Sequence, residues 1–225
     1  MGAGLGEDLA DPRAAFTRQA ATYAASAVVA DREGRARFVA AVAPASDARV
    51  LDVATGPGFT ARAFAARAGL VVGVDLTAAM LARARAEEAP PGAAPVRYVL
   101  GDAARLPVLA GAFDVVACGN ALHHFPAVEP VLREMVRACR PGGVLAVGDL
   151  ASDEDPAKAA VHNEIERLRD PSHVRAYAPG ELVALLCGLG LTVRSVATTT
   201  ARRGLGEWLA IARTPPDAAD ETRRR

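Results

Sequence analysis

The stretch Arg49-Val-Leu-Asp-Val-Ala-Thr-Gly-Pro-Gly-Phe-Thr-Ala61 joins an apolar strand pattern to a glycine turn and then to a helical pattern. A doubly wound α/β sheet has this order at the carboxyl end of its first strand, where it opens a nucleotide pocket. Asp52 lies four residues before Gly56. A carboxylate there would repel a diphosphate and attract a cationic group. The stretch therefore predicts a site for a positively charged nucleoside.

Length and charge limit the classes of function. At 225 residues the chain has the length of a single domain, 1–225. Its 26 Lys and Arg residues balance 26 Asp and Glu residues, which argues against nucleic acid as a partner. Its apolar stretches fall short of the roughly 20 residues that a membrane span needs. With no secretory signal and no metal-ligand spacing among the cysteines, we expect a cytoplasmic protein without a metal or a membrane partner.

Strand and helix patterns alternate after residue 48, which predicts an α/β, Rossmann-like fold with helices on both faces of a mostly parallel sheet. Two late strands joined by a short loop would add an antiparallel edge and bring the sheet to seven strands. The expected strands are Arg49–Ala54, Leu70–Asp75, Val96–Gly101, Phe113–Cys118, Gly143–Leu150, Leu191–Thr199 and Trp208–Ala212. The expected helices are Thr60–Arg67, Ala78–Glu88, Pro126–Arg140, one that ends near Arg169, and Pro179–Gly188.

Helical patterns outside the sheet predict a lid made of two elements, at 13–45 and 152–178. The first carries Phe16 and Tyr23 among alanines, and the second ends in a proline-containing loop. Residues 1–12 show no regular pattern and residues 214–225 are polar, and we expect both segments to be disordered.

Three acids follow successive strands of the expected sheet, namely Asp52, Asp75 and Asp102. Because parallel strands bring their carboxyl ends together, one acid could accept from a ligand ammonium, one from ribose hydroxyls and one from an adenine amine. Each acid also has a structural alternative: a plain strand–helix turn, a helix cap or a turn residue. Met80 could likewise pack on a purine or in a helix core.

The stretch from Gly56 to Ala61 also fits the loose dinucleotide pattern G-x-G-x-x-[GA], which on its own is weak. Asp52 argues against this interpretation because its carboxylate would lie near a pyrophosphate. Because the glycine pattern nevertheless fits, a nicotinamide-dependent oxidoreductase is kept as the less favoured alternative.

Five motifs follow one another along the chain, namely Val50–Gly58, Val72–Asp75, Gly101–Ala103, Phe113–Val116 and Arg140–Gly143. In this order they resemble those of class I S-adenosylmethionine-dependent methyltransferases, most closely the small bacterial ubiquinone/menaquinone-biosynthesis-type branch. The resemblance spans about residues 14–200 and departs at Ala54 and Thr55, where the family often has Gly and Cys or Ser. It implies a methyltransferase fold, S-adenosylmethionine as cofactor and S-adenosylhomocysteine as product.

The resemblance also implies roles for individual residues. Asn120 would face the methionine carboxylate and the methyl group, and Tyr23 resembles a lid residue that closes over cofactor and substrate. The expected cofactor-binding residues are Tyr23, Asp52, Ala54, Gly56, Gly58, Asp75, Leu76, Met80, Asp102, Ala103 and Asn120.

Two segments are candidates for the substrate side, Gly119–Phe125 and Asp170–Tyr177. Methyl transfer from a sulfonium is an in-line displacement, so the protein mainly supplies alignment and excludes water. A base is needed only where the acceptor must lose a proton, and His124 and His173 are the candidates. His123, Arg175 and Tyr177 are expected to contact the substrate.

These observations predict methyl transfer to a small, apolar or aromatic metabolite. An S-adenosylmethionine-binding protein of the same fold that catalyses a non-methylating reaction, such as cyclisation, is the main alternative. The sequence leaves open the acceptor atom and the presence of a homodimer.

Overall fold

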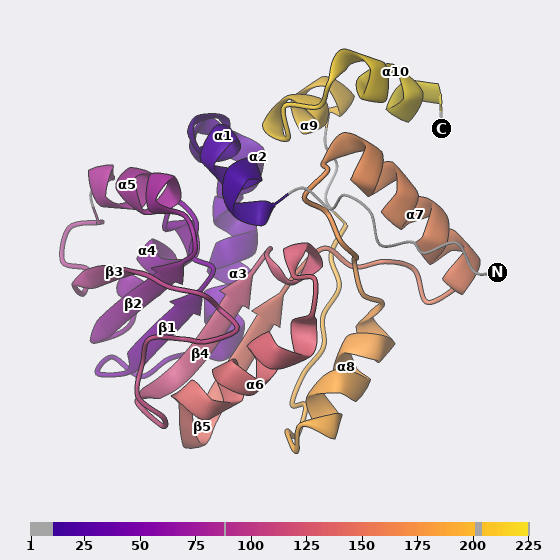
Figure 1. The fold of residues 1–225 in the computed structure, drawn as a ribbon. Helices are drawn as coiled ribbons and strands as arrows, with labels where there is room; N and C mark the ends of the chain where they lie inside the picture. Colours follow the sequence, from indigo (N-terminus) through magenta and orange to yellow (C-terminus); the bar gives the residue numbers. More distant parts are fainter. Residues whose placement is uncertain (1–10, 88, 201–203, 225) are drawn as a thin grey trace.

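A computed structural model describes residues 11–87, 89–200 and 204–224. Its centre is a parallel sheet of five strands in the order β3-β2-β1-β4-β5 (Figure 1). The chain reverses the direction of strand addition between β1 and β4, which confirms the doubly wound arrangement. The strands are β1 Arg49–Val53, β2 Leu70–Asp75, β3 Val96–Leu100, β4 Phe113–Gly119 and β5 Cys139–Gly148.

Some of the helices begin where the sequence supplies a side-chain cap. Asp11 accepts from the N–H of Arg13 at 3.0 Å before Pro12, and Asp155 accepts from the N–H of Ala157 at 2.8 Å before Pro156. The helices are α1 Pro12–Ala25, α2 Ala27–Ala30, α3 Arg32–Val42, α4 Phe59–Ala65, α5 Ala78–Ala86, η1 Leu122–His124, α6 Val128–Ala138, α7 Pro156–Arg169, α8 Pro179–Gly188, α9 Leu205–Ile211 and α10 Pro216–Arg224.

Two apolar clusters cover the two faces of the sheet. Val50 of β1 packs with Phe64 of α4 in one cluster, whereas its neighbour Leu51 packs with Leu132 of α6 in the other. Adjacent strand residues therefore point into different cores, which explains why these strands read as continuous apolar runs. The two layers fix the sheet and leave the carboxyl ends of its strands free to carry a site.

The structure confirms five predicted strands to within a few residues at each end. The largest difference is in β5, which begins at Cys139 rather than Gly143 and pairs with β4 through a register shift. The predictions at positions 1–10, Glu88 and Arg225 lie outside the described residues.

Two later strand predictions are wrong. The expected strand Trp208–Ala212 falls largely in helix α9, and Leu191–Thr199 forms no strand, so the described residues contain neither seven strands nor an antiparallel edge. The expected disordered segment 214–225 contains helix α10. Its sequence supports a helix through Asp217 in the first turn and an Arg223–Asp220 ion pair of 2.6 Å near the end.

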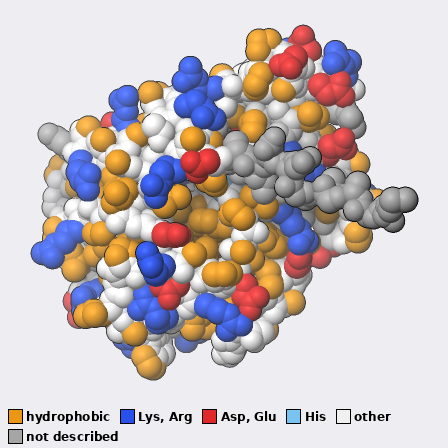
Figure 2. All heavy atoms as spheres, in the orientation of Figure 1, with side chains coloured by type: hydrophobic (Ala, Val, Ile, Leu, Met, Phe, Trp, Pro, Cys, Tyr) orange, Lys and Arg blue, Asp and Glu red, His pale blue; other side chains and the backbone are white. Residues whose placement is uncertain are grey.

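Among the described residues, no helix combines the length and the apolar character that crossing a membrane requires. Figure 2 shows that hydrophobic side chains gather in the hollowed central part of the face in view, with charged side chains around them.

Candidate cofactor and acceptor site

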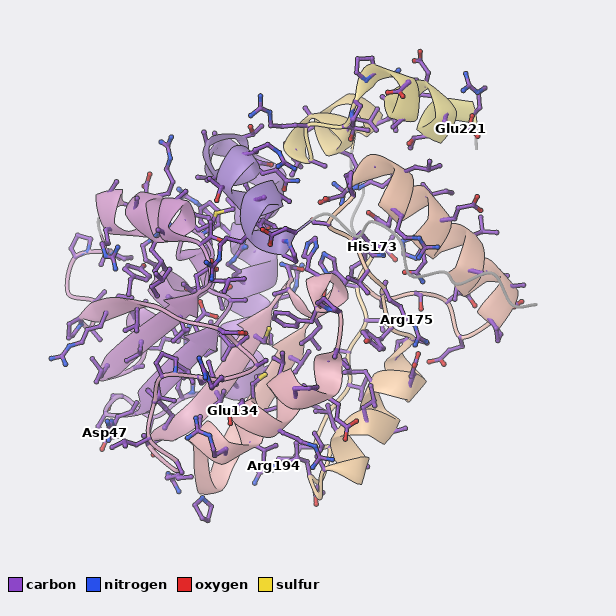
Figure 3. All side chains as sticks on the ribbon, viewed as in Figure 1. Asp47, Glu134, His173, Arg175, Arg194 and Glu221 are labelled. Atoms are coloured by element: carbon purple, nitrogen blue, oxygen red, sulfur yellow. The ribbon has the colours of Figure 1, made fainter. Side chains whose placement is uncertain are left out.

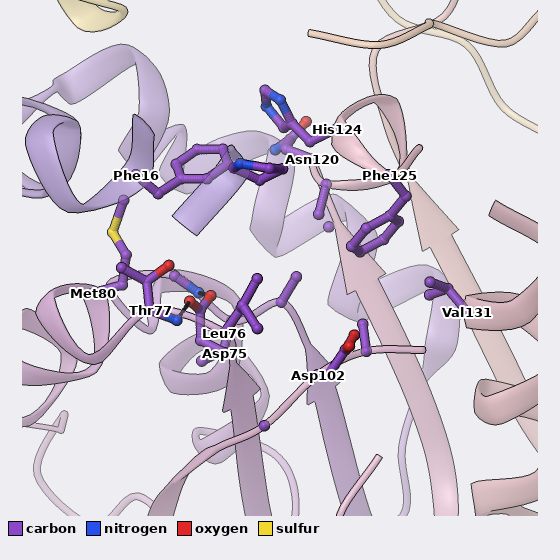
Figure 4. Close-up of a pocket in the computed structure, with 18 of the residues that line it drawn as sticks. Phe16, Asp75, Leu76, Thr77, Met80, Asp102, Asn120, His124, Phe125 and Val131 are labelled. Carbon is purple, nitrogen blue, oxygen red and sulfur yellow. Dashed lines mark hydrogen bonds between the residues drawn. The ribbon is translucent and has the colours of Figure 1, made fainter. Parts of the chain in front are cut away.

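A cavity of about 420 Å³ lies at the carboxyl ends of the strands and extends below α1 (Figure 4). Its position matches the switch point between β1 and β4, where doubly wound sheets bind ligands, and its size suits a small molecule. The expected residues that line it are Tyr23, Ala54, Gly56, Asp75, Leu76, Met80, Asp102, Ala103, Asn120 and His124. The expected residues that do not line it are Asp52, Gly58, His123, His173, Arg175 and Tyr177.

Asp75 is fixed by two backbone donors. Its Oδ2 accepts from the N–H of Gly56 and its Oδ1 from the N–H of Thr77, each at 2.8 Å. A carboxylate oxygen has a second acceptor site, so both oxygens can still accept from a ligand diol. Burial raises the pKa of Asp75, and the two N–H groups lower it. Asp75 is thus oriented in advance for bidentate binding.

Asp52 lies behind the cavity wall and is only 1% exposed. Its Oδ2 accepts from the Thr55 hydroxyl at 2.6 Å, and its Oδ1 has no hydrogen-bond partner among the described residues. Burial raises the pKa of Asp52 to about 7, against the lowering effect of that hydroxyl. Because an unpaired buried carboxylate is costly, a cationic ligand group near Thr55, which lines the cavity, would stabilise it.

The two glycines of the first motif have different roles. Gly56 has a φ of 53° and lines the cavity, and a Cβ there would meet no protein atom within 4 Å. Gly58 has a φ of 78° and does not line it; its Cβ would lie 2.3 Å from the hydroxyl of Tyr98. Gly56 therefore leaves space for a ligand, whereas Gly58 leaves space for a tyrosine.

Left-handed backbone occurs at two non-glycine residues of the cavity wall, Ala54 with a φ of 54° and Asn120 with a φ of 55°. Such conformations cost about 1–3 kcal/mol and concentrate at functional sites. The N–H of Asn120 donates to the Gly148 carbonyl at 2.7 Å, which holds the end of β4 against β5. Both residues follow the strands that flank the switch point.

Asp102 lies at the opposite side of the cavity from Phe16 and His124 in Figure 4. Its Oδ1 accepts from the N–H of Ala104 at 2.8 Å, which stabilises the turn after β3. Leu76 and Met80 lie beside Asp75 on the same wall. This end of the cavity therefore combines an oriented acid with apolar side chains, as a nucleoside requires.

The remaining wall of the cavity is mostly apolar, and the sequence did not predict its individual residues. Phe16 of α1 packs edge-on against the His124 ring, with 4.8 Å between ring centroids. The Arg35 guanidinium lies 4.9 Å from the Phe59 ring centroid, and its Nε donates to the Thr60 hydroxyl at 3.3 Å. The lining residues absent from the predicted set include Phe16, Arg35, Thr55, Thr77, Phe125, Pro126, Pro130 and Val131.

His123 and His124 have opposite environments. The Nδ1 of His123 is hydrogen-bonded to Asp149, so its pKa is raised even though burial opposes the charged form. The pKa of His124 is lowered by burial and by the neighbouring His123 cation, whose ring centroid is 4.0 Å away. His124, which lines the cavity, is therefore neutral, whereas Asp149 favours the charged form of His123 behind it.

His173 and Arg175 lie on the loop from α7 to α8 (Figure 3), and neither they nor Tyr177 line the cavity. His173 is fully buried, and its Nε2 donates to Oδ1 of Asn163 at 2.8 Å; burial lowers its pKa to about 4. Arg175 is exposed, donates to Glu181 at 2.5 Å and lies over the Tyr177 ring at 4.9 Å. Of the two histidines considered as a base, only His124 reaches the cavity.

Comparisons with known proteins agree with this geometry. Residues 51–147 match a family model described as a methyltransferase domain. The chain is 31% identical to a Bacillus subtilis protein named "Uncharacterized methyltransferase YcgJ", over 90% of this chain and 80% of that protein. It is 37% identical to a demethylmenaquinone methyltransferase of Parafrankia sp. and spans 52% of each of the two chains.

Comparison with solved structures also points to this family. YcgJ of Bacillus subtilis superposes with a TM-score of 0.80 at 29% identity, over 85% of this chain and 82% of that one. A protein from Bacillus halodurans superposes with a TM-score of 0.80 at 31% identity, over 84% and 82%. The chain therefore belongs to the class I S-adenosylmethionine-dependent methyltransferases, with S-adenosylmethionine as its cofactor.

Proposed function

We propose that the enzyme methylates a small, apolar or aromatic metabolite at an ionisable hydroxyl or an activated carbon. The observation that carries this proposal is the division of one cavity into two parts. Oriented acids, Asp75 and Asp102, stand on one side, and Phe16, Phe125 and His124 stand on the other. An apolar wall with a single neutral imidazole suits an aromatic hydroxyl better than a charged acceptor.

The first part fits the cofactor. Asp75 would hold the ribose diol, and Asp102 with the N–H of Ala103 would bind the adenine. Arg35 and Asn120 both line the cavity and would hold the methionine carboxylate. Thr55, whose hydroxyl donates to the buried Asp52, would lie near the ammonium. Bound S-adenosylmethionine supplies a methyl carbon that its sulfonium charge activates for displacement.

The second part fits the acceptor. His124 accepts a hydrogen bond from the acceptor hydroxyl and orients the oxygen toward the methyl carbon. The acceptor oxygen forms the new bond, the carbon–sulfur electron pair stays on sulfur, and the acceptor proton passes to His124. That proton is strongly acidic once the bond has formed, so an imidazole of lowered pKa is sufficient as its acceptor.

A panel of acceptors tests the proposal. The enzyme is incubated with S-adenosylmethionine and, in separate reactions, phenols and hydroquinols, apolar carboxylic acids, and primary amines, and S-adenosylhomocysteine is quantified by chromatography. We expect turnover with the hydroxylated aromatics and a large loss of it in His124→Ala. Turnover confined to amines or carboxylates would refute the assigned acceptor class.

The same samples address the other classes of function. A product formed from a cyclisable acceptor without S-adenosylhomocysteine would favour the non-methylating alternative. Calorimetric titration should give binding of S-adenosylmethionine and none of NAD, and the reverse would favour the oxidoreductase.

A further inference from the structure

Two buried residues of the loop after α7 lie directly behind the His124 ring. Ser172 is 1% exposed and Asp170 is 4% exposed. The Nδ1 of His124 lies 3.0 Å from the Ser172 carbonyl oxygen and 3.2 Å from the Ser172 hydroxyl oxygen. The hydroxyl of Ser172 in turn donates to Oδ1 of Asp170 at 2.6 Å. These contacts join the cavity histidine to a carboxylate that does not line the cavity.

The contacts determine which ring nitrogen carries the proton. A carbonyl oxygen can only accept, so the Nδ1 of His124 must donate to Ser172. The Ser172 hydroxyl has one proton, which it uses in its hydrogen bond to Asp170. Toward His124 the hydroxyl oxygen can therefore only accept. Both oxygen atoms of Ser172 therefore favour a proton on Nδ1.

Asp170 keeps this order as a carboxylate, which accepts hydrogen bonds and never donates them. Its Oδ1 also accepts from the N–H of Ser172 at 3.0 Å and from Nε2 of Gln19 at 3.4 Å, and its Oδ2 lies 3.9 Å from Nη2 of Arg169. Burial raises the pKa of Asp170, but the hydroxyl and the N–H of Ser172 and the Arg169 guanidinium lower it below its usual value. The carboxylate is therefore ionised at neutral pH.

We propose that Asp170 and Ser172 are positioning residues that hold His124 in the Nδ1–H tautomer and so leave the unprotonated Nε2 available to the acceptor. The described residues supply no hydrogen bond to Nε2, and the His124 side chain lines the cavity. In the other tautomer, Nε2 would donate a hydrogen bond and could not accept the proton of a hydroxyl. The inference rests on the proposed function, but the state of the ring can be measured without turnover.

The tautomer is read directly from two-bond ¹H–¹⁵N correlation spectra of the full-length protein labelled with ¹⁵N in histidine, at pH 7. The four histidines are assigned from single substitutions, with His124→Asn identifying the relevant signal. We expect wild-type His124 to carry its proton on Nδ1. A proton on Nε2 in the wild-type protein would overturn the inference.

Variants at Asp170 test the role of the carboxylate. In Asp170→Asn the amide oxygen can still accept from Ser172, so we expect the Nδ1–H tautomer to persist. In Asp170→Ala the Ser172 hydroxyl is free to donate to Nδ1, so we expect a mixture of tautomers. The matched control is Asp153→Ala, at the exposed opposite end of α7. An unchanged tautomer in Asp170→Ala would refute the role of Asp170.

Kinetics supply the second readout. In Asp170→Ala, kcat with a hydroxyl acceptor should fall in proportion to the fraction of His124 in the Nδ1–H form, while the Kd of the cofactor stays unchanged. If Asp170→Ala does not fold, Asp170→Asn and Ser172→Ala remain as tests. Both variants keep only acceptors facing Nδ1 and should keep the proton there, and a switch to Nε2–H in either variant contradicts the inference. If the wild-type protein has the expected tautomer but His124→Ala keeps full turnover, the proposed function of His124 as a base is refuted, whereas the inference about the tautomer is not.

Discussion

The backbone N–H of Gly56 donates to Oδ2 of Asp75 across 2.8 Å, so the loop after β1 holds the carboxylate at the end of β2. Thr77 holds the other oxygen at the same distance. Neither oxygen has to be ordered when a ligand binds, and preorganisation of this kind increases affinity. The glycine turn and the acid thus form one unit.

Replacing Asp75 by Ala removes two charge-assisted hydrogen bonds to the cofactor and should weaken its binding by about 1.5–3 kcal/mol. Calorimetric titration with S-adenosylmethionine measures the change. Asp114→Ala is a matched control, because Asp114 also accepts a backbone N–H at 2.8 Å but lies near the other end of β4. A wild-type Kd in Asp75→Ala would place the ribose elsewhere.

Alanine at the two glycines should separate binding from stability. Gly58→Ala places a Cβ 2.3 Å from the Tyr98 hydroxyl at a positive φ, so the midpoint of thermal unfolding should fall. Gly56→Ala also strains the backbone, but its methyl group enters ligand space, so it should in addition weaken cofactor binding. Titration of the folded fraction distinguishes them, and equal Kd values in both variants would contradict this division of roles.

The pH dependence of turnover follows from the lowered pKa of His124. An imidazole that accepts a proton is active when neutral, and burial with the His123 cation keeps His124 neutral well below its ordinary pKa of 6.5. The rate with a hydroxyl acceptor should therefore show no acid limb near pH 6.5. An acid limb near pH 6.5 in the wild-type profile that is absent from the His124→Asn profile would contradict the lowered pKa of His124.

His173 should make the protein less stable in acid. Its pKa falls from 6.5 in the unfolded chain to about 4 in the folded one, so the unfolded state binds more protons between these values. Its contribution to the free energy of unfolding is present above pH 6.5 and decreases by at most about 1.4 kcal/mol per unit as the pH falls toward 4.

Urea unfolding at pH 7 and pH 5 measures this effect. His173→Gln keeps a donor for Asn163 and cannot titrate, so the variant should lose less stability than the wild-type protein over that interval. An identical loss in the two proteins would show that His173 is not the titrating group.

The sheet was predictable because its strands carry their own signals. Continuous apolar runs that end in Asp52, Asp75 or a glycine mark strands buried on both faces, and the topology then brings their carboxyl ends together. This is why Asp75 and Asp102 could be placed near one cavity without knowledge of any contact, whereas Asn120 was expected there from the family resemblance. The run Trp208–Ala212 has no such neighbours, and five apolar residues suit a helix as well as a strand.

The loop residues could not be placed from the sequence. His173 lies on the expected loop, but Asn163 of α7 accepts its Nε2–H and also the N–H of Ala176, which turns the ring inward. Phe16 and Arg35 reach the cavity from helices whose orientation depends on tertiary packing rather than on periodicity. The helical pattern of the amino-terminal segment does not indicate which side of each helix points toward the cavity.

Gln19 on α1 donates to both Asp170 and the carbonyl oxygen of Ala212, which lie 151 and 193 residues further along the chain. The helix that brings Phe16 and Tyr23 over the cavity is thus anchored by residues from the far half of the polypeptide. A fragment trimmed to the conserved-domain match at 51–147 would keep the acids at the strand tips but lose the roof above them. The smallest unit able to enclose both reactants is close to the whole chain.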